Sequence, residues 1–139
     1  MFTLHPKLQQ DCILLKELAL CSLLLMNDAN YPWFILVPRR EGITEIYQLS
    51  LSDQYQLLQE SNQVSQFLVK TFQPTKLNIA ALGNVVPQLH IHHIARYTTD
   101  PAWPAPVWGK ISAMAYTEEQ IEKIRQLFSY SFSHFMGEG

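Results

Sequence analysis

The sequence has little cysteine, little charge and no Cys-x-x-Cys pair. Cys12 and Cys21 each lie in an apolar stretch, which predicts buried, reduced thiols rather than a disulfide framework. Charged residues make up 16% of the 139 residues and the formal net charge is -2, so no field of one sign is available to attract a polyanion. The nearest approach to a basic cluster is Arg39-Arg40. We therefore expect no nucleic acid polymer among its partners.

A long uninterrupted apolar run is also missing. The stretch 12–26 contains Lys16, Glu17 and Ser22, so it falls short of the roughly 20 apolar residues that cross a bilayer. The first residues show no basic segment followed by an apolar one, so no signal peptide is expected. We expect no membrane partner and a cytoplasmic location. The 47% hydrophobic content is globular, and the length suits one domain spanning residues 1–139.

Hydrophobic patterning predicts an α+β fold, in which an antiparallel sheet is combined with two main helices. Strands are expected over 12–17, 20–27, 33–37, 76–82 and 86–97. Long helices are expected over 52–72 and from residue 117 to about 135, after a short helix that starts at Pro6. Ser52 is the expected cap of the first long helix, while Thr117 and Gln120 form a capping box for the second.

Three of the five histidines fall within four residues, at positions 90, 92 and 93. Because side chains alternate along a strand, Gln88, His90 and His92 are predicted to share one face. His93 is predicted to lie on the opposite face, away from any site that the other two form.

Two histidines on one face allow three interpretations, which the histidines alone leave open. They can be a structural pair held by hydrogen bonds, two ligands of a metal ion, or a nucleophile with a neighbouring hydrogen-bond donor. A catalytic zinc site needs three protein ligands and a structural site needs four, and the sequence offers no matching thiolate or third histidine. We therefore expect no metal ion and no other cofactor.

The neighbouring residues favour chemistry on a phosphate ester. Gly83 and Asn84 form a turn just before the histidines, where backbone N–H groups and an amide can face an anion. Asp28 follows a buried strand that we expect to lie beside the histidine strand, and a carboxylate there suits the paired hydroxyls of a ribose. Together these residues indicate a nucleotide-like ligand.

Residues 83–94, GNVVPQLHIHHI, resemble the histidine triad (HIT) family, whose signature is His-φ-His-φ-His-φ-φ with φ apolar. Residues 23–28 and 34–40 resemble the first hairpin of that family and the acidic residue after its strand. The resemblance spans about residues 15–100, and the remainder, 101–139, holds a loop rich in Trp and Pro and then a helix. The loop, with Trp103 and Trp108, is similar to a feature of a bacterial subgroup.

The resemblance implies a homodimer with a nucleotide site in each subunit, no metal requirement, and a covalent nucleotidyl-histidine intermediate. It implies that His90 is the nucleophile and that His92 contacts the α-phosphate or the bridging oxygen. It further implies that Asp28 binds the ribose hydroxyls, while Gly83 and Asn84 lie at the phosphate.

The sequence departs from the family signature at several positions. Gln88 stands in place of the first histidine, and an amide can hydrogen-bond but cannot titrate. Val85 replaces a hydroxyl residue, and Asn84 replaces a longer amide. His93 stands where the family has an apolar residue. The nucleophile is retained, but the anion site has fewer donors.

We therefore expect an enzyme that hydrolyses or transfers a nucleoside monophosphate from an ester, anhydride or phosphoramidate, with a purine-type nucleotide or nucleoside phosphate as its ligand. The departures at Gln88 and Val85 favour an alternative, a catalytically weak nucleotide-binding protein on the same scaffold. A dimeric interaction protein that uses the aromatic surface around Trp103 and Trp108 is a further alternative.

Overall fold

The computed structural model describes residues 1–136, and side chains up to residue 132. Its elements are α1 (Pro6–Asp11), β1 (Cys12–Glu17), β2 (Cys21–Met26), β3 (Trp33–Pro38), the 3-10 helix η1 (Ile46–Gln48), α2 (Leu51–Phe72), β4 (Lys76–Ala80), β5 (Ile91–Arg96) and α3 (Glu118–Met136). The α+β prediction is confirmed, as is the expected order of strands and helices along the chain.

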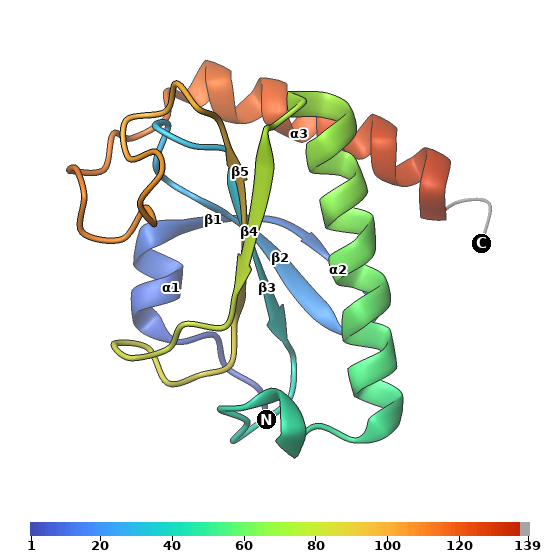
Figure 1. Ribbon diagram of the computed structural model, residues 1–139. Coiled ribbons are helices and arrows are strands. Elements are labelled where there is room, and N and C mark those ends of the chain that lie inside the picture. Colours follow the sequence, from blue (N-terminus) through green and yellow to red (C-terminus); the bar gives the residue numbers. More distant parts are fainter. Residues whose placement is uncertain (137–139) are drawn as a thin grey trace.

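The five strands form one antiparallel sheet in the order β1-β2-β3-β5-β4. Figure 1 shows α2 along one face of this sheet, α1 and the loop before α3 on the other face, and α3 across one end. In the central rows of the sheet, Leu25 pairs with Phe34 and Phe34 with His93, while Ile35 pairs with His92. Adjacent residues of β5 therefore face different layers of the molecule.

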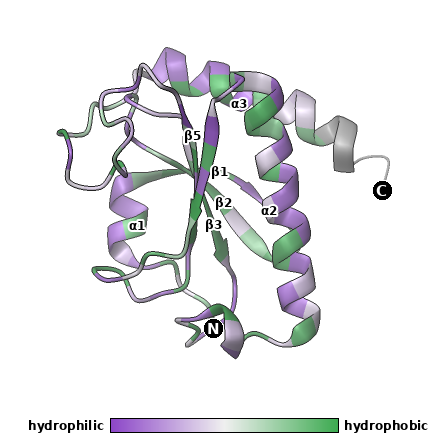
Figure 2. Cartoon of the chain, in the orientation of Figure 1, coloured by the Kyte–Doolittle hydropathy of each residue, from purple (hydrophilic) through white to green (hydrophobic). Residues whose placement is uncertain are grey.

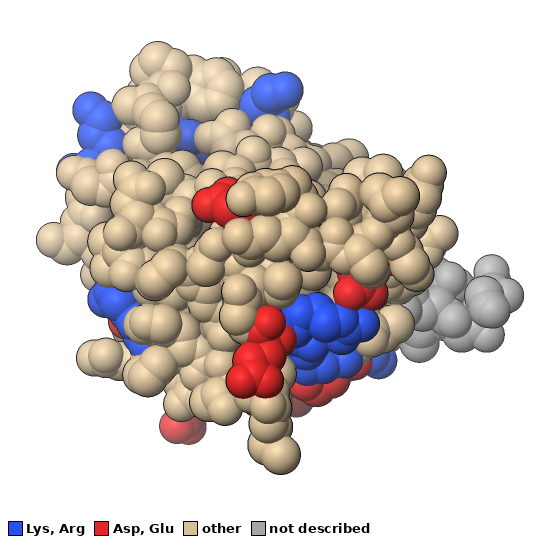
Figure 3. Space-filling view, turned by 90° about the horizontal axis from the view of Figure 1, so that it is seen from below, with Lys and Arg blue, Asp and Glu red and all other residues tan. Residues whose placement is uncertain are grey.

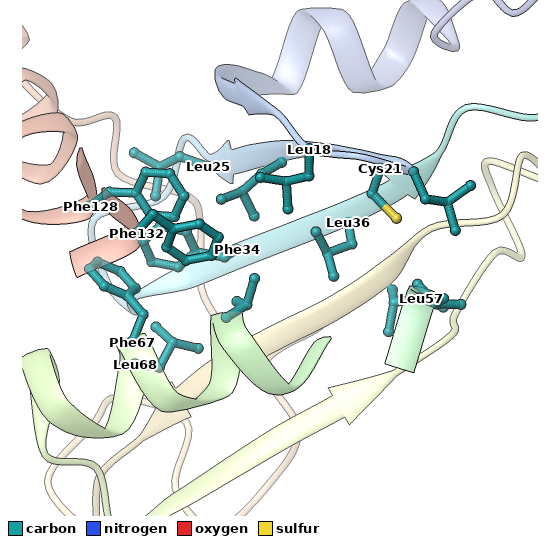
Figure 4. Packing of buried hydrophobic residues seen from close by; sticks show 14 of the residues in the cluster. Leu18, Cys21, Leu25, Phe34, Leu36, Leu57, Phe67, Leu68, Phe128 and Phe132 are labelled. Carbon is teal, nitrogen blue, oxygen red and sulfur yellow. The ribbon is translucent and has the colours of Figure 1, made fainter. Parts of the chain in front are cut away.

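Four phenylalanine rings pack together within the largely aliphatic core between the sheet and the two long helices. Phe67 of α2 lies edge-to-face with Phe34 of β3 at 5.6 Å and with Phe128 of α3 at 5.4 Å between ring centroids (Figure 4). Phe132 packs on Phe128 at 4.1 Å. Each such buried ring contributes on the order of 1.5–3 kcal/mol through removal of apolar surface from water. Hydrophobic and hydrophilic segments both occur along α2 (Figure 2), as expected for a helix with one buried side.

The opposite face of the sheet carries a second buried cluster. It combines Leu24, Ile35 and Ile94 from the strands with Leu8 of α1 and Val107 of the loop. The loop is fixed by a buried ion pair, in which Arg96 donates to Asp100 at 2.8 Å and 3.1 Å. The segment rich in Trp and Pro is thus an ordered part of the body.

Helix caps confirm one prediction and correct another. Thr117 and Gln120 form the expected reciprocal pair, with the Gln120 N–H on the Thr117 hydroxyl and the Thr117 N–H on the Gln120 amide oxygen. The predicted cap at Ser52 is wrong. The cap of α2 is Ser50, whose hydroxyl accepts the Asp53 N–H at 3.1 Å, because α2 starts one residue earlier than predicted.

The histidine strand is shorter than predicted. We expected it over 86–97, but β5 begins at Ile91. Gln88 and His90 therefore belong to the segment that leads into the strand, where no neighbouring strand fixes the direction of each side chain.

A buried carboxylate ties α2 to the start of β2. Glu60 is fully buried, and its two oxygens accept the backbone N–H groups of Leu20 and Cys21, each at 2.9 Å. The amide of Gln56 donates to the same carboxylate at 2.7 Å. Nothing in the helical pattern of the sequence distinguishes Glu60 from an exposed acidic residue, and the structure shows it to be a structural contact.

Charged side chains of both signs lie next to each other on the face shown in Figure 3. Arg40, for example, donates to Asp53 at 2.7 Å and 3.0 Å. Within residues 1–136, no helix has both the length and the hydropathy needed to cross a bilayer.

Candidate functional site

His90 lies immediately before β5 and is 95% shielded from solvent, with 5% of its surface exposed. Its Nδ1 lies 2.7 Å from the Gln88 carbonyl oxygen. A carbonyl only accepts, so this nitrogen carries the proton and Nε2 keeps its lone pair. Burial lowers the pKa of His90, while the Gln88 carbonyl acts in the opposite direction. The ring is therefore neutral near pH 7 and has a nitrogen suited to nucleophilic attack.

His92 lies against His90, with the two ring centroids 4.8 Å apart and the rings edge-to-face. The indole N–H of Trp33 donates to Nδ1 of His92 at 3.0 Å. Since an indole N–H can only donate, Nδ1 is unprotonated and the proton of the neutral ring lies on Nε2. Burial, followed by the charge of His90, lowers the pKa of His92 to about 4. His92 is therefore a fixed neutral ring at neutral pH.

His93 faces the opposite side of the sheet, as the alternation of side chains predicts. Its Nε2 lies 2.7 Å from the Ser61 hydroxyl of α2, and its Nδ1 lies 3.1 Å from the Ile91 carbonyl. Burial lowers the pKa of His93 to about 4. His93 is thus a hydrogen-bonded part of the core between sheet and helix, separate from His90 and His92.

A polar pocket of about 320 Å³ opens beside His90. Its lining includes Thr44, Glu45, Gly83, Asn84, Gln88 and His90. A Cβ at Gly83 would lie 2.8 Å from the Val86 carbonyl oxygen, so the tight turn at this position requires glycine. The structure thus brings the predicted residues Gly83, Asn84, Gln88 and His90 together at one pocket.

Gln88 does not point toward His92 as the predicted strand geometry implied. Its amide nitrogen donates to the Thr3 carbonyl at 2.8 Å, and its amide oxygen accepts the His5 N–H at 2.9 Å. The side chain therefore holds the segment before α1 against the site. Val85, the other main departure from the family signature, is 75% exposed.

The expectation that the strand before Asp28 neighbours the histidine strand is wrong, because β3 lies between β2 and β5. Leu24 is the β2 residue level with His92, and Asp28 follows four residues later, beyond the end of the strand. Its buried carboxylate accepts N–H groups from Asn30 and from Met114 at 2.7–3.2 Å. In this structure Asp28 holds its own turn and the segment before α3.

Several contacts made by the tryptophans and by His5 were not predicted from the sequence. Trp33 bonds to His92, and Trp108 packs edge-to-face on the same ring with 5.1 Å between centroids. Trp103 lies over the guanidinium of Arg96 at 5.8 Å. His5 is brought near by Gln88. These partners depend on strand register and on the path of the N-terminal segment, which local patterns do not specify.

The described residues contain no group of three or more His, Cys, Asp or Glu side chains arranged to hold a metal ion. The pair His90 and His92 would supply two nitrogens at most, and Nδ1 of His92 already accepts the Trp33 N–H. The geometry therefore favours imidazole chemistry over metal ligation.

Comparisons with known proteins agree with the sequence motif. The HIT domain family model matches residues 7–99. The chain is similar to a crystallised histidine triad protein from Marinobacter aquaeolei VT8, with 50% identity, 96% of this chain and 98% of that chain covered, and a TM-score of 0.93. A histidine triad protein from Bradyrhizobium japonicum shows 44% identity over 94% of this chain and 97% of that chain, with a TM-score of 0.91.

A histidine triad nucleotide-binding protein from Sulfolobus tokodaii shares the fold at 13% identity, with a TM-score of 0.67 and coverage of 94% of this chain and 92% of that chain. The search of curated proteins found no match.

Proposed function

This chain belongs to the histidine triad family, and from that premise we propose that it binds a nucleotide and cleaves it through a covalent nucleotidyl-histidine. The observation that carries the proposal is the 2.7 Å hydrogen bond between Nδ1 of His90 and the Gln88 carbonyl. This bond directs the lone pair to Nε2 in a residue that lines the polar pocket. It also stabilises the positive charge that develops on the ring during attack.

The proposed reaction has two displacements at phosphorus. In the first, Nε2 of His90 attacks the nucleoside monophosphate group, a P–N bond forms, and the bond to the leaving group breaks. The leaving group departs with the electron pair and takes a proton from solvent. In the second, water attacks phosphorus, the P–N bond breaks with its electrons returning to Nε2, and a proton is released to solvent. A second alcohol or amine in place of water would give transfer instead of hydrolysis.

The substrate class is a purine-type nucleoside monophosphate joined to a leaving group by an ester, anhydride or phosphoramidate bond. Gly83 and Asn84 support this assignment because they place a tight turn and an amide side chain in the same pocket as His90. Such a turn can offer backbone N–H groups to phosphate oxygens.

His92 acts in this proposal mainly by positioning His90. Its ring supports His90 with 4.8 Å between ring centroids, and its Nδ1 is held by the Trp33 indole N–H. The departures from the family signature at Gln88 and Val85 favour the alternative function, a nucleotide-binding protein with weak turnover. In that alternative the exposed, apolar Val85 leaves the phosphate with one donor fewer, and a missing donor can cost roughly two to three orders of magnitude in rate.

The test is mass spectrometry of the protein mixed with adenosine 5′-phosphoramidate. We expect a nucleotidyl adduct on the peptide that contains His90, together with steady release of AMP. His90→Ala should lose both the adduct and the turnover but retain most of its AMP affinity, because the nucleophile acts in the chemical step. Leu14→Glu, an exposed change on the far edge strand, is the matched control.

Three outcomes would contradict parts of this proposal. AMP binding without an adduct or turnover in the natural protein would establish the binding-protein alternative. Undiminished turnover in His90→Ala would eliminate the covalent mechanism. Loss of activity in a strong zinc chelator, with recovery on adding zinc, would point instead to metal chemistry.

We further propose that the protein is a homodimer whose interface is the apolar face of α2 and β4. This face forms a groove of about 430 Å³ lined by Leu51, Tyr55, Leu58 and Ile79, each more than half exposed. β4 is also an edge strand, with unpaired backbone groups. A second copy of this chain fits best. Around one two-fold axis, the apolar face of each copy covers that of the other, and the two β4 edges can hydrogen-bond to each other.

A further inference from the structure

Gln88 connects the nucleophile to the N-terminal segment through three hydrogen bonds. Its backbone carbonyl lies 2.7 Å from Nδ1 of His90, while its side chain contacts the Thr3 carbonyl at 2.8 Å and the His5 N–H at 2.9 Å. The planar amide thus pairs with the backbone of the segment much as a neighbouring strand would. His5 is held beside the site by the residue that replaces the missing first histidine.

The ring of His5 has a defined hydrogen-bonding state. His5 precedes α1, and its Nδ1 accepts the Lys7 N–H at 3.1 Å. In the neutral ring the proton must therefore be on Nε2, which is left to donate to a ligand. The ring is half-buried, and its positive charge, when present, lowers the pKa of His90. The geometric link is Gln88, which lines the pocket together with His90 and bonds to the backbone N–H of His5.

We propose that His5 is the third imidazole of the site and that its Nε2–H donates to a non-bridging oxygen of the phosphate attacked by His90. The Gln88 side chain is held by the backbone of Thr3 and His5, and as an amide it offers no imidazole N–H and no positive charge to the phosphate. Val85 has no donor side chain. His5 supplies from the N-terminal segment the donor that the strand lacks, and Gln88 is the positioning residue that keeps it there. This inference rests on the proposed phosphate site.

The experiment compares turnover of adenosine 5′-phosphoramidate by His5→Asn and by the natural protein. Asn retains a side-chain acceptor for the start of α1 but is too short to replace the imidazole. We expect kcat to fall by roughly ten- to a hundredfold with a smaller change in KM, as for loss of one phosphate donor. Lys7→Ala is the matched control, because it changes the exposed surface of the same helix while keeping the backbone N–H.

A double-mutant cycle tests the positioning role. Gln88→Met removes both amide contacts but keeps the backbone carbonyl that bonds His90. Its kcat should therefore fall by a factor similar to that for His5→Asn. The kcat of the double variant should be little lower than that of either single variant, since both changes remove the same donor. Additive losses would overturn the link between Gln88 and His5.

Chemical rescue separates phosphate binding from a structural effect. His5→Gly leaves space for added imidazole at small cost to the helix start, so imidazole should restore part of its kcat but leave the natural protein unaffected. If His5→Asn turns over as fast as the natural protein while His90→Ala is inactive, this inference is overturned and the proposed function stays intact. If the natural protein binds AMP without turnover, His5→Asn should weaken AMP binding severalfold, and an unchanged affinity would overturn the inference. Undiminished turnover in His90→Ala, or no AMP binding at all, would overturn both.

Discussion

The indole N–H of Trp33 donates a 3.0 Å hydrogen bond to Nδ1 of His92, the ring that supports the proposed nucleophile. Trp33 pairs with Ile94 across the β3–β5 ladder, which places its side chain diagonal to His92 on the same face. An indole nitrogen can donate but cannot accept, so this contact fixes the proton of the neutral His92 ring on Nε2. It also opposes protonation, because a proton on Nδ1 would face the indole N–H.

Trp33→Phe should therefore release the ring of His92. We expect the ring to populate both neutral tautomers, while its pKa should stay below the ordinary value because the ring remains buried. Nitrogen-15 NMR of the histidine side chains measures both quantities. Trp108→Phe, which keeps a ring against His92, is the control and should leave the tautomer unchanged. A single Nε2–H tautomer in Trp33→Phe would show that another group fixes the proton.

The pKa values of the buried histidines predict loss of stability in acid. The pKa of His93 is about 4 in the folded chain and about 6.5 in its ordinary state, so between these values the unfolded chain binds more protons. The free energy of unfolding should therefore fall as pH drops from 6.5 to 4. His93→Gln can keep a hydrogen bond to Ser61 without titrating. Its free energy of unfolding should therefore fall less over the same pH range. Urea unfolding of both proteins at pH 8, 6 and 5 measures the difference. The same pH dependence in the two proteins would show that His93 is not the titrating group.

Glu60 should be one of the most sensitive polar positions for stability. Glu60→Gln leaves one acceptor oxygen for the two backbone N–H groups of Leu20 and Cys21. We expect the free energy of unfolding to fall by about 1–3 kcal/mol, the usual cost of a buried donor without a partner. Chemical denaturation measures it, with the exposed Glu122→Gln as control. Equal stability of the two variants would mean that water reaches these N–H groups.

Asp28→Ala distinguishes a turn residue from a ribose ligand. The contacts of Asp28 with Asn30 and Met114 predict a loss of stability and an equal, small change in affinity for AMP and 2′-deoxy-AMP. Calorimetric titration with both nucleotides is the measurement. A loss confined to AMP would restore the ribose role that the sequence suggested.

Because the proposed dimer interface is the apolar face of α2 and β4, a charged residue placed on that face should give a monomer. Leu58→Glu should sediment as a monomer at micromolar concentration, whereas the natural protein should sediment as a dimer. Leu14→Glu alters a similarly exposed leucine on the opposite edge strand and should remain dimeric. A natural protein that is already monomeric would disprove the proposed interface.

The sequence predicted the strands, the two long helices and the opposite orientation of His93, because these follow from short-range periodicity. It also placed Gly83, Asn84, Gln88 and His90 at one pocket, because they are neighbours along the chain. It wrongly made β2 a neighbour of the histidine strand, since the strand order that puts β3 between β2 and β5 is a long-range property. The roles of Trp33 and His5 were missed for the same reason.

The tryptophans around His92 give the protein its own optical probe. Trp33 and Trp108 both contact His92, while Trp103 lies over Arg96. A protonated imidazole in contact with an indole quenches its fluorescence, so two of the three emitters should respond to the charge of His92 and the third should not. Acid titration and ligand binding can therefore be followed by intrinsic emission, without a label and at low protein concentration.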